Sequence, residues 1–198
     1  MTGKIYFVRH GTIPSNKRRV YAGWSEEELD PDGVGPVKEA GVFLSGRSVR
    51  RIFSSPLKRA MQTSAILQEF LPEAEISVEA GLKEMKLGPW EGMFEDDIAV
   101  QYPAEYEVWK TTPSELRLSG RETLQQLQLR ALSAVRRLES VTREGSSVVA
   151  VTHVALIRVL WLYSNDMALD SYKTVDVPNA SIFQFSDDNH LPSMERML

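Results

Sequence analysis

Five residues of this sequence have the types needed for chemistry on a phosphate group: Arg9, His10, Arg59, Glu84 and His153. Two guanidinium groups and an imidazolium can hold the oxygen atoms of a phosphoryl group while a second imidazole attacks the phosphorus. Arginine suits this task because its planar fork binds phosphate through two hydrogen bonds and stays charged at any working pH. A carboxyl group beside them would serve the leaving oxygen.

These residues come directly or shortly after predicted β-strands. Short apolar runs and β-branched residues predict strands at Ile5–Val8, Arg51–Ser54, Ile76–Val78, Ser146–Thr152 and Ile182–Phe185. In a parallel α/β sheet, ligands bind outside the carboxyl ends of the strands. We therefore expect the five side chains to converge on one edge of the sheet, where Gly11 lets the backbone turn tightly and approach an anion.

Helical patterns separate these strands. Apolar residues recur at three- and four-residue steps from Pro56 to Phe70, after a cap at Ser55, and again from Glu122 to Glu139. Strands that alternate with helices of this length predict right-handed crossovers. The expected fold class is therefore α/β, with a mostly parallel central sheet and helices on both faces.

The segment from about 87 to 121 interrupts this alternation with aromatic residues among acidic ones. We expect an inserted helical cap there, within a single domain that covers residues 1–198. The aromatic side chains would pack the cap against the sheet, and they also suggest a nonpolar or ring-bearing leaving group. The acidic stretch from Glu26 to Asp32 is expected to be a solvated loop, and His190 an exposed loop residue.

Composition argues against several other classes of protein. The chain has 198 residues, a formal net charge of −4 and no cysteine, which excludes disulfides, thiol nucleophiles and Cys-ligated metal centres. The basic residues are scattered, which argues against nucleic acid as a partner, and no apolar run is long enough to cross a membrane. We expect a cytoplasmic protein without a cofactor, and without a metal because arginines beside the histidines would repel a dication.

Six blocks along the chain carry these candidate residues and their neighbours: Arg9-His10-Gly11 with Asn16, Ser54–Thr63, Leu82–Glu84 with Gly88–Gly92, Gly120–Thr123 with Arg130, Val151–Arg158, and Pro178–Ile182. In this order, the blocks resemble those of the histidine phosphatase superfamily, in its phosphoglycerate mutase-like branch 1. The resemblance runs from residue 5 to about residue 185. It also implies the phosphoglycerate mutase-like α/β fold.

The resemblance implies a role for each matching residue. The residues expected to be catalytic are His10, Glu84, His153, Arg9 and Arg59. The residues expected to bind substrate are Arg9, Gly11, Asn16, Arg59, His153 and Val154. Among these, His10 would become phosphorylated and Glu84 would donate a proton. The function expected is that of a metal-independent phosphomonoesterase of histidine acid phosphatase type, which hydrolyses a small phosphorylated metabolite through a phosphohistidine.

Two alternatives remain open. A phosphoglycerate mutase would have to let the phosphorylated intermediate turn over in the pocket while water is kept out. The short chain counts against it, and so does Thr12, which stands where glutamate is typical of the mutases. Two further departures are Pro36-Val37, where Gln-Ala is frequent, and Val154, where glycine is usual. The second alternative is a domain that binds phosphoesters or a partner without catalysis, and the presence of all five candidate residues argues against it.

Overall fold

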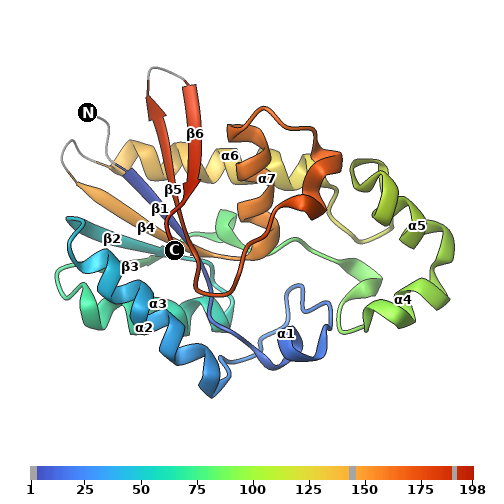
Figure 1. The fold of residues 1–198 in the computed structure, drawn as a ribbon, viewed down its shortest axis with the longest axis horizontal. Coiled ribbons are helices and arrows are strands. Elements are labelled where there is room, and N and C mark those ends of the chain that lie inside the picture. Colours follow the sequence, from blue (N-terminus) through green and yellow to red (C-terminus); the bar gives the residue numbers. More distant parts are fainter. Residues whose placement is uncertain (1–3, 143–145, 189–190) are drawn as a thin grey trace.

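The apolar strand segments form one six-stranded sheet in the computed structural model, which describes residues 4–142, 146–188 and 191–198. The strands are β1 (Lys4–Arg9), β2 (Val49–Ser54), β3 (Glu75–Val78), β4 (Ser147–Thr152), β5 (Ile182–Asp188) and β6 (Leu191–Arg196), in the spatial order β3-β2-β4-β1-β5-β6 (Figure 1). β1 to β4 are parallel, whereas β5 runs antiparallel to both β1 and β6. The expected α/β class with a mostly parallel sheet is confirmed.

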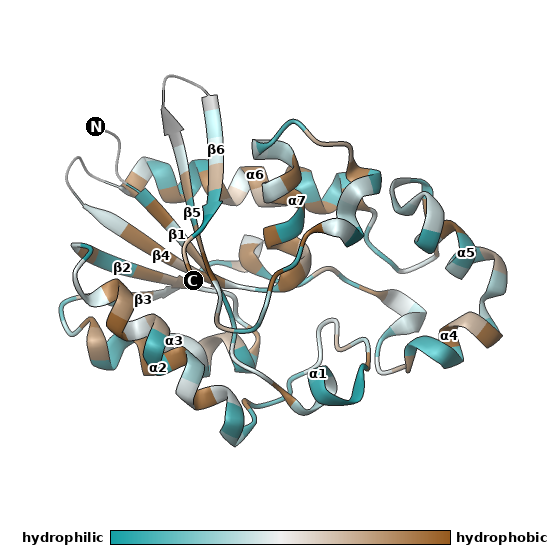
Figure 2. Ribbon diagram, in the orientation of Figure 1, coloured by the Kyte–Doolittle hydropathy of each residue, from teal (hydrophilic) through white to brown (hydrophobic). Residues whose placement is uncertain are grey.

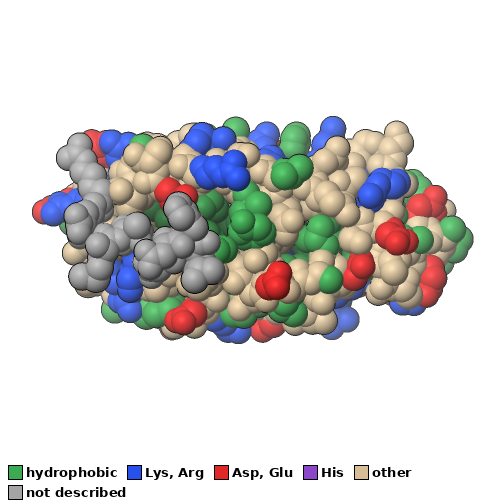
Figure 3. Space-filling model, turned by 90° about the horizontal axis from the view of Figure 1, so that it is seen from above, with side chains coloured by type: hydrophobic (Ala, Val, Ile, Leu, Met, Phe, Trp, Pro, Cys, Tyr) green, Lys and Arg blue, Asp and Glu red, His purple; other side chains and the backbone are tan. Residues whose placement is uncertain are grey.

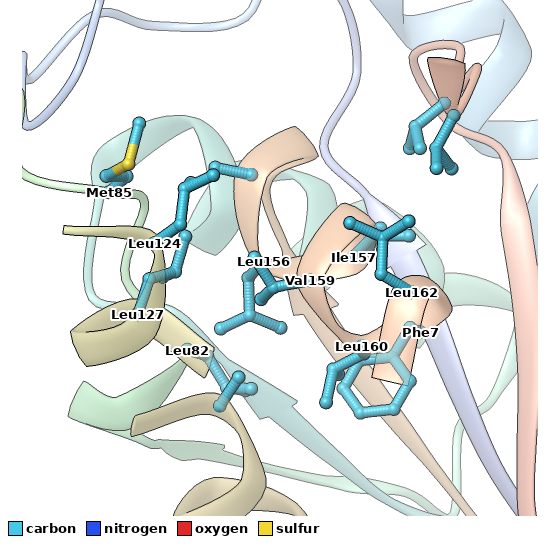
Figure 4. Packing of buried hydrophobic residues seen from close by; sticks show 14 of the residues in the cluster. Phe7, Leu82, Met85, Leu124, Leu127, Leu156, Ile157, Val159, Leu160 and Leu162 are labelled. Atoms are coloured by element: carbon cyan, nitrogen blue, oxygen red, sulfur yellow. The ribbon is translucent and has the colours of Figure 1, made fainter. Parts of the chain in front are cut away.

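Helices cover both faces of this sheet (Figure 1). On one side lie α2 (Pro31–Ser45) and α3 (Lys58–Phe70), and on the other lie α6 (Leu124–Val141) and α7 (Val154–Ser164). Because side chains of a strand alternate between faces, Phe7 of β1 joins the core with α6 and α7, and Val8 joins the core with α2 and α3. The hydropathy colouring of Figure 2 shows the central strands as apolar, and Figure 4 shows leucines of α6 and α7 in the core that contains Phe7.

Two helix boundaries differ from the sequence-based expectation, each for a local reason. The helix expected from Pro56 begins at Lys58, because Leu57 has an extended backbone (φ −67°, ψ 139°). The helix expected from Glu122 begins two residues later, because Thr123 and Gln126 form a reciprocal capping box.

Among the elements that the sequence analysis did not anticipate are two helices and an edge strand. α2 begins where a solvated loop was expected to end, and the Asp30 carboxylate caps it by accepting the N–H of Asp32. α7 is apolar almost all round its surface, so it has little amphipathic pattern to detect. β6 contains Pro192, which is tolerated because this strand is at the edge of the sheet.

The segment 87–121 folds into short helical pieces at one end of the molecule (Figure 1). They are η2 (Gly88–Trp90), α4 (Glu95–Gln101), α5 (Pro103–Thr111) and η3 (Pro113–Glu115). Trp90 is fully buried among them, with its ring centroid 6.1 Å from that of Tyr21 and 6.3 Å from those of Tyr102 and Trp109. Aromatic packing therefore joins this segment to the loop that follows α1 (Pro14–Arg18).

The molecular surface mixes charges of both signs. On the face shown in Figure 3, Lys and Arg side chains lie among Asp and Glu side chains and small hydrophobic areas. Among the helices in the described ranges, none is both long and apolar enough to span a membrane. His190, expected in an exposed loop, lies outside the described residues.

Candidate active site

Two histidines meet at the carboxyl ends of neighbouring strands. His10 follows β1 and His153 follows β4, and because these strands pair in parallel register the two ring centroids are 5.1 Å apart. The N–H of His10 donates to the carbonyl of Thr152 at 3.0 Å, which extends the ladder beyond β1. Both imidazoles are buried.

Hydrogen bonds fix the His10 ring and the position of its proton. Nδ1 of His10 lies 2.7 Å from the carbonyl oxygen of Gly11. A carbonyl oxygen only accepts, so Nδ1 carries the proton and the lone pair is on Nε2. The Nε–H of Arg59 donates to this Nε2 at 3.2 Å. Gly11 itself donates its N–H to Thr63 Oγ1 at 3.1 Å, so it orients His10 from behind.

The two arginines of the site are held by backbone carbonyls rather than by carboxylates. Arg59, the second residue of α3, is buried and donates to the carbonyls of Ser25 and Gly23, both at 2.7 Å. Arg9 donates from one terminal nitrogen to Val177 O at 2.5 Å. Its Nε is buried and has no partner among the described residues. Burial lowers the pKa of Arg9 to about 10, and it also lowers the pKa of Arg59. Because arginine stays protonated in proteins, both guanidinium groups are charged at neutral pH.

Glu84 supplies a buried carboxyl group beside these cations. It follows the turn η1 (Ala80–Leu82), accepts the N–H of Met85 at 2.7 Å, and its carbonyl accepts the indole N–H of Trp24 at 2.8 Å. Burial raises the pKa of Glu84, and this effect exceeds the opposing influence of the Met85 N–H and of the charge on Arg59. The carboxyl therefore keeps its proton to higher pH than an exposed glutamate.

Both imidazoles are neutral at pH 7. Burial, followed by the charges of Arg59 and Arg9, holds the pKa of His10 well below its usual value. Burial and the charge of Arg59 do the same to the pKa of His153. The imidazolium expected from the sequence is therefore a neutral ring here. His153 Nε2 lies 2.7 Å from Ser55 Oγ, while its Nδ1 is buried without a partner in the described part of the chain.

A cavity of about 410 Å³ opens in front of these groups. Arg9, His10, Arg59 and Glu84 line it, as do the predicted substrate-binding residues Asn16 and Val154. Gly11 and His153 lie behind this wall and are not among its lining residues. The structure therefore brings all the predicted residues to one place, six of them on the cavity and two directly behind it.

Asn16 has a defined orientation in this wall. Its Oδ1 accepts the N–H of Ile13 at 3.2 Å and the side-chain amide of Asn179 at 3.0 Å. The same Asn179 nitrogen also donates to the carbonyl of His10 at 3.0 Å. Since Oδ1 is used twice, the Nδ2 group of Asn16 is left to donate to a ligand.

Sequence reasoning did not assign a role to several residues that shape the site: Ser55, Thr63, Arg158, Lys173 and Asn179. All of them except Lys173 lie within the six sequence blocks named in the sequence analysis. Arg158 could have been found from helical spacing, because Val154 and Arg158 are four residues apart on α7 and share a face; both line the cavity. Lys173 gives no such signal.

Within the described ranges, no group of three or more His, Asp or Glu side chains is arranged to hold a metal ion.

Known proteins resemble this chain over nearly its whole length. The family model of the histidine phosphatase superfamily (branch 1) matches residues 5–197. A 2,3-bisphosphoglycerate-dependent phosphoglycerate mutase from Cytophaga hutchinsonii is 26% identical, covering 96% of this chain and 91% of that protein. Phosphoserine phosphatase 1 from Hydrogenobacter thermophilus is 27% identical, with coverages of 90% and 83%. The solved structure of Bacillus stearothermophilus YhfR has a TM-score of 0.89 at 25% identity, and the match covers 99% of this chain and 96% of that one.

Proposed function

The chain belongs to the histidine phosphatase superfamily (branch 1), and from this premise we propose that it is a metal-independent phosphomonoesterase that works through a phosphohistidine. One observation carries the proposal. The lone pair of His10 Nε2 accepts a hydrogen bond from the guanidinium of Arg59, and both side chains line a cavity that Glu84 also lines. A neutral nucleophile among fixed cations suits attack on a phosphoryl dianion.

The first step transfers the phosphoryl group to the enzyme. His10 Nε2 forms a bond to phosphorus while the ester P–O bond breaks, and Glu84 gives its proton to the leaving oxygen. The phosphoryl oxygens take the N–H donors of Arg59, Arg9 and His153, of which the last two have buried nitrogen atoms without a partner in the described chain. Asn16 Nδ2 and the backbone N–H of Val154 complete the donor set. These donors are already in place, so they need little reorganisation as charge develops.

The second step restores the enzyme. A water molecule attacks the phosphorus, its proton passes to the Glu84 carboxylate, and the N–P bond breaks to release inorganic phosphate and neutral His10. The carbonyl of Gly11 accepts the Nδ1–H bond of His10 throughout the cycle, which keeps the reactive lone pair on Nε2. We also propose that the segment 87–121 acts as a cap over the leaving group, since Leu87, Glu95 and Trp109 line the cavity.

Replacement of His10 by alanine tests the mechanism. The wild-type protein should release phosphate from p-nitrophenyl phosphate, form an acid-labile phosphoenzyme with a ³²P-labelled ester, and keep its activity after dialysis against EDTA. The His10→Ala variant, with folding checked by circular dichroism, should neither release phosphate from the ester nor form a phosphoenzyme. Near-normal turnover by this variant would overturn the assignment of the nucleophile.

Mutase activity is a second candidate because relatives such as the protein from Cytophaga hutchinsonii are phosphoglycerate mutases. Thr12, which stands where glutamate is typical of the mutases, argues against it. Incubation with phosphoglycerate separates the candidates: a phosphatase releases phosphate, whereas a mutase isomerises the ester and releases none. Tight binding of phosphoesters with no turnover over hours would instead indicate a binding domain.

A further inference from the structure

A second pair of cations lines the cavity beyond the phosphoryl site. Arg158, on α7, and Lys173, on the turn η4 (Leu169–Thr174), are both part of the cavity wall. Neither forms an ion pair with an acidic side chain within the described residues. Two neighbouring cations without a counter-ion repel each other and attract an anion into the cavity.

Arg158 is rigidly held in a position next to the phosphoryl-binding arginine. Its Nε donates to the carbonyl of Val175 at 2.9 Å, just as Arg9 donates to the carbonyl of Val177. Residues two apart in an extended chain are separated by about 6–7 Å, and Val175 has an extended backbone (φ −83°, ψ 113°). The positive charge of Arg158 also helps to lower the pKa of Arg9, which is a sign that the two groups are close.

Glu95 is the acidic residue of the wall at this end, and its carboxylate is already engaged. Its Oε1 accepts the hydroxyl of Tyr106 at 2.9 Å and that of Tyr21 at 3.4 Å. It lies near enough to favour the charged form of Lys173, whose pKa is lowered mainly by partial burial. With Arg158 included, this end of the cavity keeps a net positive charge.

The aromatic rings of the wall serve as supports for cations. The guanidinium carbon of Arg158 lies 5.0 Å from the ring centroid of Tyr172. Lys173 Nζ and the guanidinium carbon of Arg121 lie 5.1 Å and 4.3 Å from the Trp109 ring centroid. Because cations already occupy these rings, the aromatic residues do not favour the nonpolar or ring-bearing leaving group that the sequence suggested.

From these contacts, and resting on the proposed phosphatase activity, we infer that Arg158 and Lys173 form a specificity site for a second anionic group on the leaving group. The substrate class is a small phosphate ester whose carboxylate or second phosphate lies two or three carbon atoms from the ester oxygen, a length that suits the spacing of the carbonyls of Val175 and Val177. A guanidinium beside an ammonium provides both a planar fork and a point charge for such a group.

Four esters with the same three-carbon chain test this inference: propyl phosphate, 3-aminopropyl phosphate, 3-phosphooxypropanoate and propane-1,3-diol bisphosphate. None of them can be isomerised like phosphoglycerate, so released phosphate measures hydrolysis alone. The wild-type kcat/KM should be at least about tenfold higher for one or both anionic esters than for propyl phosphate, and lowest for the amine. The two anionic esters distinguish a carboxylate from a second phosphate.

Substitution of the two cations gives the decisive comparison. In Arg158→Gln and in Lys173→Gln, the ratio of kcat/KM for the preferred anionic ester to that for propyl phosphate should fall about tenfold. Lys110→Gln is the matched control, because Lys110 pairs with Glu107 and is not part of the cavity wall; its ratio should equal the wild-type ratio. Lys173→Gln, at a less buried position, keeps the test valid if Arg158→Gln does not fold.

The outcomes separate the two proposals. Hydrolysis of all four esters with equal kcat/KM, or a preference that survives both substitutions, overturns the specificity site and leaves the phosphatase intact. Absence of hydrolysis of every ester, together with absence of a phosphoenzyme, overturns the phosphatase itself.

Discussion

Removal of the Ser55 hydroxyl should impair catalysis through His153 while leaving the fold intact. Ser55 Oγ accepts the N–H of Leu57 at 3.4 Å and lies 2.7 Å from His153 Nε2. We expect the hydroxyl to donate its proton to this nitrogen, because within the described residues it has no other acceptor. Nε2 then acts as the acceptor, so the proton of the neutral ring is on Nδ1. This is the buried nitrogen without a partner among the described residues, and the donor that we propose for the phosphoryl group.

The size of the effect follows from burial. Ser55 and His153 are fully buried, so Ser55→Ala leaves a buried Nε2 unsatisfied, at a cost of about 1–3 kcal/mol. The variant also loses the preference for the Nδ1–H tautomer, and a loss of about 1.4 kcal/mol from the transition state corresponds to a tenfold fall in kcat/KM. We expect a fall of about tenfold to a hundredfold.

Ser54→Ala is the matched control for this experiment. Ser54 is equally buried and donates to the carbonyl of Ser55 at 2.9 Å, whereas the side-chain hydrogen bond of His153 in the described structure is made with Ser55. Both variants should lose some thermal stability, and only Ser55→Ala should lose most of its kcat/KM.

The pH dependence of the deficit follows from the neutral state of His153. Because burial holds the pKa of His153 well below its usual value, the ring is neutral at pH 7 and above, and its tautomer decides which nitrogen donates. The deficit of Ser55→Ala relative to Ser54→Ala should therefore be the same when kcat/KM is measured at pH 7 and at pH 8, and equal kcat/KM for the two variants would refute the reasoning.

Two further predictions concern pH and glycine. The pKa of His10 is held well below 6.5, so the wild-type kcat/KM should persist below pH 6.5. The pKa of Glu84 is raised, so kcat/KM should decline on the alkaline side as Glu84 loses its proton, and Glu84→Gln should remove this alkaline decline. A wild-type kcat/KM that falls on the acidic side with a midpoint at pH 6.5 would contradict the assignment of His10. Gly11→Ala should lower the melting temperature, because the new Cβ would lie 2.7 Å from the carbonyl oxygen of Gly33. Overpacking of this kind reduces the free energy of unfolding by about 1–3 kcal/mol. Gly35→Ala, where the new Cβ would meet no atom within 4 Å beyond its own helix backbone and its chain neighbours, should lower the melting temperature less than Gly11→Ala does, because only the ring of the adjoining Pro36 opposes it. Equal thermal melts of the two variants would refute the packing argument.

Parts of the fold could be predicted because their signals are local. β4 is rich in β-branched residues and buried along its full length, and such a segment gives a strong local signal for a strand. α2 was not predicted, although Asp30 followed by Pro31 is a local signal for a helix start. Its interior contains Pro36, which weakens the helical pattern that should follow this signal.

The sequence by itself determined which groups could perform the chemistry. The arginines, histidines and glutamate of the site each lie at the end of a strand or within a few residues after it. The carboxyl ends of parallel strands meet at one sheet edge, so residue type and order in the chain were sufficient to group them. Only the tertiary structure decided their states. The neutral charge of His153 comes from burial, and the orientation of Arg59 comes from carbonyls on a distant loop. Burial and long-range backbone contacts exist only after folding, and for that reason no local pattern in the sequence encodes them.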